Sequence, residues 1–436
     1  MKTTTKQQYG DIELGKRLRK LRLARGLTQA DLAEPKYTHA HVSTIEAGRR
    51  MPSEDALEFF AQKLGVDSDE LATGRPAGVA AELRVRVEQA RAGISEGHLD
   101  AAKKSTQSVI KEAREFRLPR VEARAHEVLA LALERSGDFE GAVRSYEKAV
   151  GILKSEAPTA WAGAIAGQLR CLDQQQDPHQ AIFIGENYLE RLKQTRMSSP
   201  AALLRVTTAL ILPYLHSGSL VRARESADRC QQLIPRVNDP FNLAVSYVNI
   251  AAVQLERGLH ADANISLAKA EELFETQDLT SEAGMALLAR GVNLARDGKD
   301  EAKSVLERAS SALAKAGHRV QQSLAELELG RLERLAGQFQ NAVVRIEQAL
   351  RLLAPGAQPR LEAWGRRELG LALAAIKDKR AEKELGKAIE LYRSQKLHQE
   401  VARTYVTMAR LHPATSKLRL KALEQAADAI EQVTDL

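Results

Sequence analysis

The sequence predicts an all-α fold, in which a small domain of short helices precedes a right-handed α-solenoid of about eight to nine helical hairpins. Ala, Leu, Glu, Lys and Arg dominate its 436 residues, and aromatic residues make up only 4%. This composition is typical of helical proteins. Turn-forming residues recur about every forty positions over most of the chain, while the first 75 residues follow a different pattern.

Charge and cysteine content exclude several classes of protein. The net charge of +7 permits an anionic partner. Cys171 and Cys230 are the only cysteines and neither has a nearby partner in sequence, so a disulfide framework or a Cys-based zinc site is not expected. The first residues lack the apolar core of a signal peptide, and the longest apolar run, "ALILPYL", is too short to span a bilayer. We therefore expect a cytoplasmic protein without a membrane partner.

The first two predicted helices are bounded by clear signals. In "LGKRLRKLRLARG", leucines recur at helical spacing and Gly26 stands where a C-cap would. The short helix "LTQADLAE" follows, with Thr28 as its N-cap and Asp31 in the capping-box position. Pro35 ends this second helix.

Two further short helices complete the N-terminal domain. Thr38 caps a third helix, in which Val42 and Ile45 form the apolar side, and Gly48 closes it. A fourth is predicted over "PSEDALEFFAQKLGV". Short helices joined by tight turns are what a helix-turn-helix module requires.

Residues 12–72 resemble the lambda-repressor/Cro-type (XRE) family of DNA-binding domains. The matching elements are Arg22, "LTQADLA" and "THAHVSTIEAGRRMPS", while the turn "EPKY" is about one residue shorter than in the family. The resemblance implies that the partner is a double-stranded DNA operator, bound by a homodimer through two half-sites. It also implies an ion pair between Arg22 and Glu46, whose alternative is two independent surface charges.

The third helix is the predicted reading element. His39 and His41 lie about 200° apart on a helix, so both cannot ligate one metal ion from it. Burial of Val42 and Ile45 turns Ala40, Ser43, Thr44 and Ala47 outward and leaves the two histidines on the flanks. The alternative to DNA reading is a solvated helix face. The resemblance implies base-edge contacts at His39, Ala40, Ser43 and Thr44. It implies phosphate contacts at Gln29, Arg49 and Arg50.

The remaining chain is repetitive. Turn signals fall at Gly97, Gly137, Asp177, Gly218, Gly258, Gly298 and Gly337, with spacings of 40, 40, 41, 40, 40 and 39 residues. An eighth turn is expected at 376–382 and a degenerate ninth at 412–417. Amphipathic patterns flank each turn, so each unit is a helical hairpin. The predicted divisions are a tail at 1–10, the helix-turn-helix domain at 11–74, a linker at 75–82 and the repeats at 83–436.

The repeats resemble tetratricopeptide (TPR) units. In "LALERSGDFEGAVRSYEKAV", Gly137, Asp138 and Phe139 stand at the turn, and Ala142 and Ala149 follow on the second helix. The usual TPR period is about 34 residues, and HEAT-like hairpins have a period nearer to forty. The side-chain signature favours TPR, because period alone is not specific. Such arrays form a superhelix with a long concave surface.

The concave surface is the candidate ligand site. The resemblance implies groove positions at Arg124, Gln168, Arg205 and Asn249, where an amide can pair with a peptide backbone and arginines with a carboxylate. Asn249 can also be structural, and the arginines can be solvated surface. An XRE module followed by a TPR array resembles the RRNPP-type regulators, which bind short signalling peptides in the superhelix and DNA as dimers.

Two functions follow from these patterns. One is a ligand-responsive transcriptional regulator, nucleoid-associated when bound to DNA. The other is a protein-interaction scaffold that uses its helix-turn-helix for docking or localisation. No phosphate loop, HExxH or GxSxG motif is present in the sequence, and no His or Cys set has ligand spacing. We therefore expect no enzyme activity, cofactor or metal.

Overall fold

The computed structural model describes residues 3–76, 78–194, 199–354 and 356–434, and these ranges contain helices and no strand. Contacts divide the chain into two compact units. The first comprises residues 1–94 and 99–155, and the second comprises residues 95–98 and 156–436. The all-α prediction is confirmed, because the described ranges contain helices and no strand.

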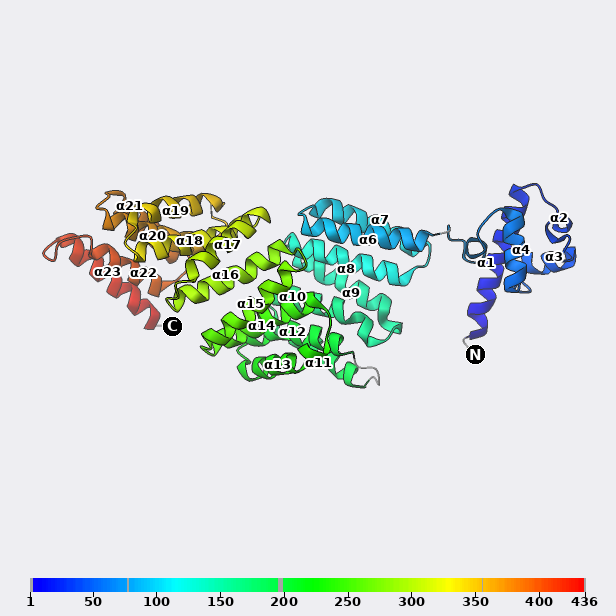
Figure 1. Ribbon diagram of the computed structural model, residues 1–436, viewed down its shortest axis with the longest axis horizontal. Helices are drawn as coiled ribbons and strands as arrows, with labels where there is room; N and C mark the ends of the chain where they lie inside the picture. Colours follow the sequence, from blue (N-terminus) through cyan, green and yellow to red (C-terminus); the bar gives the residue numbers. More distant parts are fainter. Residues whose placement is uncertain (1–2, 77, 195–198, 355, 435–436) are drawn as a thin grey trace. The chain divides into compact units, whose positions relative to one another are not determined.

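Five helices form the N-terminal domain (Figure 1): α1 Thr3–Ala24, α2 Gln29–Ala33, α3 His39–Glu46, α4 Glu54–Leu64 and α5 Ser68–Thr73. The caps predicted at Thr28 and Thr38 are present, and Thr28 forms a complete capping box with Asp31. At α4, Ser53 accepts a hydrogen bond from the amide of Ala56. Their apolar faces meet in one core around Leu18, Ile45 and Phe60, which are fully buried.

Four longer helices complete the first unit: α6 Val79–Ser95, α7 Leu99–Glu115, α8 Pro119–Arg135 and α9 Phe139–Ile152. Two predicted boundaries need correction. Most of the predicted tail is helical, because α1 begins at Thr3, and helix extension adds a hydrogen bond for each residue ordered. The end of the predicted linker at 75–82 is also helical. Val79 is buried in the same core cluster as Leu83, and this packing starts α6 earlier than composition indicates.

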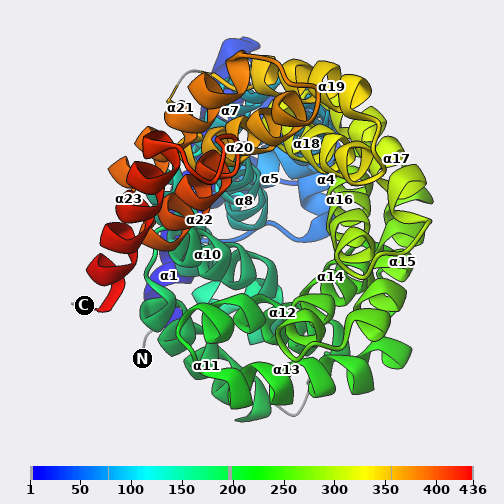
Figure 2. The ribbon, with the colours of Figure 1, turned by 90° about the vertical axis from the view of Figure 1, so that its left-hand side faces the viewer.

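The second unit continues the hairpins. Its helices are α10 Ala162–Gln174, α11 Pro178–Gln194, α12 Pro200–His216, α13 Leu220–Leu233, α14 Pro240–Glu256, α15 His260–Glu275, α16 Thr280–Arg296, α17 Ala302–Lys315, α18 Arg319–Leu335, α19 Phe339–Leu352, α20 Pro359–Ala375, α21 Arg380–Ser394, α22 His398–Ala409 and α23 Lys417–Thr434. Within this unit, Figure 2 shows the first helices of successive hairpins, such as α12, α14, α16 and α18, on the inner side of a curve. Their partners α13, α15, α17 and α19 lie on the outer side.

The turns fall where the sequence predicts them, but two use an unexpected residue. Gly137 adopts a left-handed conformation with φ of 82° between α8 and α9. At the third turn the left-handed residue is Gln176 (φ 63°) rather than Asp177, and at the eighth it is Lys377 (φ 58°). Arg117, between α7 and α8, has the same conformation. A similar turn therefore occurs both within and between hairpins, and first helices of 17 residues such as α18 account for the long period.

Close helix packing within a hairpin depends on glycine at one buried position. On α18, a Cβ added to Gly330 would lie 2.5 Å from Cγ1 of Ile346 on α19. Ile346 is itself fully buried, so its side chain has no space into which to move. Gly386 on α21 differs, because an added Cβ would meet no atom within 4 Å.

We expect Gly330→Ala to lower the free energy of unfolding by about 1–3 kcal/mol, because the methyl group overpacks the α18–α19 contact. The matched control, Gly386→Ala, should be stabilising by up to about 1 kcal/mol, since alanine costs less backbone entropy in a helix. Urea unfolding of the full chain, followed by circular dichroism, measures both. A loss of similar size in both variants would contradict the packing explanation.

Candidate functional site

Helix α3 packs against α1, and its first turn is capped. Val42 and Ile45 are fully buried, and the Thr38 hydroxyl accepts a hydrogen bond from the amide of His41 at 3.3 Å. Gly15 lies where α1 passes α3, and any side chain there would collide with the backbone oxygen of Ile45. Gly15 is a residue that the sequence analysis missed, although its place beside buried Leu14 on an otherwise regular helix was a signal.

A buried ion pair connects the same two helices. Arg22 donates from Nε and Nη2 to the two carboxylate oxygens of Glu46, at 2.7 and 3.0 Å. Its Nη1 donates to the backbone oxygen of Leu27 at 2.7 Å. The side chains are only 8% and 4% exposed. The hydrogen bonds to Glu46 raise the pKa of Arg22, although burial opposes this. Gln29, predicted to contact phosphate, donates one amide hydrogen to Glu46 at 2.9 Å.

The outer face of α3 carries the residues predicted to contact bases. His39, Ala40 and Ser43 are exposed, and Thr44 is half-buried. The Thr44 hydroxyl donates to the backbone oxygen of His41 at 2.8 Å, which leaves its methyl group and oxygen lone pairs to face outward.

Arg49 and Arg50 follow immediately after α3 and are exposed. Neither makes a side-chain hydrogen bond or ion pair within the ranges that the structure describes. Both guanidinium groups are therefore available to an external anion.

His41 does not lie on the flank of this face, contrary to prediction. It is half-buried, and its ring centroid is 5.1 Å from that of Tyr37 and 6.4 Å from that of Phe60. Its Nε2 atom is buried without a hydrogen-bond partner. The cause is the aromatic cluster that Tyr37 forms with Phe59 and Phe60, which attracts the imidazole inward. His41 is therefore a packing residue.

The four predicted groove residues are divided between the two units. Arg124, in the first unit, pairs with Glu88 and Glu127 at 3.0 Å each. The other three lie in the second unit. Arg205 donates to Asn242 at 3.1 Å and to Asp239 at 3.3 Å. Two are buried and therefore do not line an open surface: Gln168 and Asn249.

Asn249 has a structural contact of its own. Its amide lies within 3.4 Å of the backbone oxygen of Thr208 on the preceding first helix, α12. This contact between α14 and α12 corresponds to the structural alternative for Asn249.

Within the described ranges, no helix combines the length and apolar content needed to cross a membrane. No group of three or more His, Cys, Asp or Glu residues there is placed to hold a metal ion.

We expect Arg22→Met to lower the unfolding free energy of the N-terminal domain by about 3–5 kcal/mol, because Glu46 then remains buried without its cation. Hydrogen exchange of residues 14–72, measured in the full chain, reports the local free energy of opening. The control Arg50→Met removes an exposed arginine and should stay within about 0.5 kcal/mol of the parent. If both variants changed stability equally little, the pair would be worth no more than a surface bridge.

Comparisons with known proteins separate the same two parts, the N-terminal domain and the helical repeats. Residues 13–74 match a family model described as a helix-turn-helix domain. No curated protein sequence matches the chain. Among solved structures, the apo form of RapI is 12% identical, with a TM-score of 0.55, and the match covers 81% of this chain and 98% of RapI.

Two further solved structures are similar. PH0952 of Pyrococcus horikoshii is a STAND signal-transduction ATPase with a tetratricopeptide repeat sensor, 13% identical at a TM-score of 0.58, and the match covers 76% of this chain and 52% of PH0952. PlcR of Bacillus thuringiensis, solved with the peptide PapR7 and DNA, is 15% identical at a TM-score of 0.40, and the match covers 62% and 96%. The chain therefore joins an N-terminal helix-turn-helix domain to a TPR-like helical solenoid, a fold similar to those of RapI and PH0952.

Proposed function

We propose that this protein is a sequence-specific, DNA-binding transcriptional regulator, whose TPR-like solenoid senses a short signalling peptide and controls operator binding by a homodimer. The observation that carries the proposal is the outer face of α3. This face is exposed at three of its four predicted contact positions, is fixed to the domain core by a buried ion pair and is followed by two free arginines. A solvated helix face does not require such rigid support.

The base-reading part of the proposal assigns one chemistry to each position. Ala40 presents a methyl group, which suits the methyl of thymine in the major groove. His39 and Ser43 can donate or accept at base edges, and Thr44 accepts through its oxygen because its proton is directed to His41. A helix of eight residues inserted by its N-terminal half brings these side chains to adjacent base pairs.

The phosphate contacts set the register of α3 on the duplex. Arg49 and Arg50 supply the charge, and each neutralised phosphate releases counterions. Gln29 has one amide hydrogen directed to Glu46, so the second remains for a phosphate oxygen. In this arrangement Glu46 orients Gln29 as well as Arg22, and the same carboxylate supports both the fold and the DNA contact.

The sensing part is supported by architecture. A solenoid of hairpins presents a long inner surface, and PH0952, which shares the fold, has repeats described as a sensor. The alternative function is a scaffold that binds proteins through the repeats and uses the helix-turn-helix only for localisation. A regulator requires that ligand binding change the affinity for DNA, whereas a scaffold does not.

The proposal predicts that the full-length protein, mixed with sheared genomic DNA at moderate salt, retains a defined sequence. We expect sequencing of the retained DNA to show a near-palindrome with half-sites about 10 bp, or a multiple of that, apart. Sedimentation of the complex then gives the number of chains per operator. If selection fails both with and without a peptide fraction of cell extract, the operator-binding function is wrong.

A pair of variants tests the contacts. Thr44→Ala should relax sequence preference at one base pair, with a loss of about 1–3 kcal/mol for the preferred sequence. Arg50→Ala should instead weaken binding to all sequences alike and reduce the salt slope by about one. Fluorescence anisotropy with operator and scrambled duplexes over a range of salt concentrations separates the two effects. Unchanged binding by both variants would contradict the placement of α3 in the major groove.

A further inference from the structure

A row of arginines crosses the inner helices near the end of the solenoid. Arg296, Arg331, Arg367 and Arg403 lie on α16, α18, α20 and α22, at 16, 12, 8 and 5 residues after the first residue of each helix. Each step is close to one helical turn, so the four side chains occupy nearly the same side of successive helices. Figure 2 shows these helices on the inner side of the second unit.

Two cavities lie along this row. The first, of about 480 Å³, is lined by Val292, Arg296, Leu324, Glu328, Arg331 and Trp364. All six come from first helices, which places this cavity on the inner face. The second, of about 520 Å³, is lined by residues that include Arg367, Arg403, Val406 and Arg410. Trp364 and Arg367 are one turn apart on α20, so the two cavities adjoin.

The arginines of these cavities outnumber the carboxylates. Five arginines line the two cavities. Among the described residues, the carboxylates that line the cavities or pair with these arginines are Glu328 and Glu400, so three positive charges remain in excess. Glu328 binds Arg331 at 2.7 Å, and Glu400 binds Arg403 at 2.8 Å.

Three of the guanidinium groups retain hydrogen-bonding capacity. Arg367 reaches Glu400 only at 3.8 Å, and its Nε atom is buried without an acceptor. Within the described ranges, Arg296 and Arg410 have no side-chain hydrogen bond or ion pair. A guanidinium group has five N–H donors, so these side chains are far from saturated.

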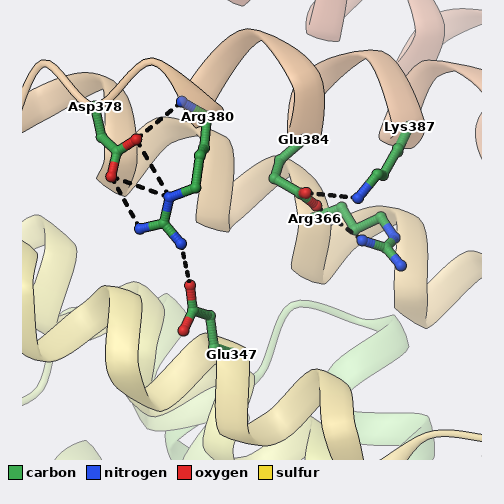
Figure 3. Close-up of polar contacts among 6 residues, drawn as sticks. All are labelled: Glu347, Arg366, Asp378, Arg380, Glu384 and Lys387. Carbon is green, nitrogen blue, oxygen red and sulfur yellow. Dashed lines mark hydrogen bonds and ion pairs between the residues drawn. The ribbon is translucent and has the colours of Figure 1, made fainter.

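The neighbouring arginine on α20 shows the contrast. Arg366 binds Glu362 at 2.7 Å. It also binds Glu384 at 2.8 Å, and Glu384 accepts from Lys387 at 2.7 Å (Figure 3). Arg380 on α21 is likewise paired, with Asp378 and Glu347 at 2.9 Å each (Figure 3). Arg366 and Arg380 are thus matched by carboxylates, whereas Arg296, Arg367 and Arg410 beside the two cavities are not fully matched among the described residues.

We propose that the two adjoining cavities bind a short acidic peptide, with carboxylates at the arginines and an apolar side chain against Trp364. This inference deepens the sensing half of the proposed function and rests on it. Arginine recognises carboxylates through paired hydrogen bonds. Val292, Leu324 and Val406 add apolar walls that a small inorganic anion does not use. The charge is distributed over four helices, so an elongated ligand fits it better than a compact one.

The test uses the full-length protein and two fluorescein-labelled mixtures of hexapeptides. In the first, Asp or Glu occupies alternate positions among apolar residues, and in the second Asn or Gln replaces every acidic residue. Fluorescence anisotropy should show binding of the acidic mixture that weakens as salt increases, and little binding of the amide mixture. Equal binding of the two mixtures, or of neither, would overturn the proposal.

Variants locate the site. Arg367→Gln and Arg410→Gln should each weaken binding of the acidic mixture by about tenfold, the loss of one charge-assisted contact. Arg410 is exposed, so its variant keeps the fold even if Arg367→Gln disturbs packing. The control Arg351→Gln changes the same charge on α19, where Arg351 is exposed and no described residue pairs with it, and should bind as the parent does. Equal losses in all three variants, or none in the first two, would contradict the assignment.

Competition identifies the kind of ligand. Unlabelled acidic peptide should displace the probe at far lower concentration than inorganic phosphate or duplex DNA. Displacement by phosphate or DNA at the same concentration would show a general polyanion surface and overturn the proposal.

The same samples are used in the genomic DNA selection. Peptide binding without operator enrichment contradicts the regulator function alone, and enrichment without peptide binding contradicts this site alone.

Discussion

In both parts of the protein, a short helix is stable only when it buries its apolar face against other helices. A helix of 17 residues such as α18 has a buried side that no single helix can cover, so the chain reverses about every twenty residues and each hairpin covers the next. Left-handed residues such as Gly137 and Lys377 make these reversals possible in three or four residues. The inner surface on which a ligand site can form is a product of this stacking.

In the N-terminal domain, the helices are too short for packing alone to orient α3. Arg22 and Glu46 supply the missing constraint, because a buried bidentate pair has a defined geometry that apolar contacts lack. Gln29 joins the same carboxylate, so the start of α2 and the end of α3 share one acceptor. Polar contacts at Glu46 thus add to the apolar packing that positions α3 in the core around Phe60.

Most of the fold was predictable, because turns and caps are local. Thr28 and Thr38 cap through their hydroxyl groups an amide three residues away, and the turn glycines act through their own backbone. All were located from sequence. Gln176 and Lys377 were not, since neither residue type signals a left-handed conformation. The environments of His41 and Asn249 could not be predicted, because they come from distant residues: Phe60 for one, and Thr208 for the other. The cavity arginines Arg296 and Arg410 could not be singled out from sequence, because only the structure shows which charges lack a partner among the described residues.

The diagonal placement of the inner arginines has a mechanical consequence. Four successive hairpins contribute to the row, and in a solenoid each hairpin contacts only its neighbours, so bending is distributed over soft interfaces between them. A molecule that touches α16 and α22 at once ties together hairpins that otherwise do not restrain one another. Such a molecule reduces the number of curvatures that these hairpins can adopt, and this ordering is an entropic cost of its binding.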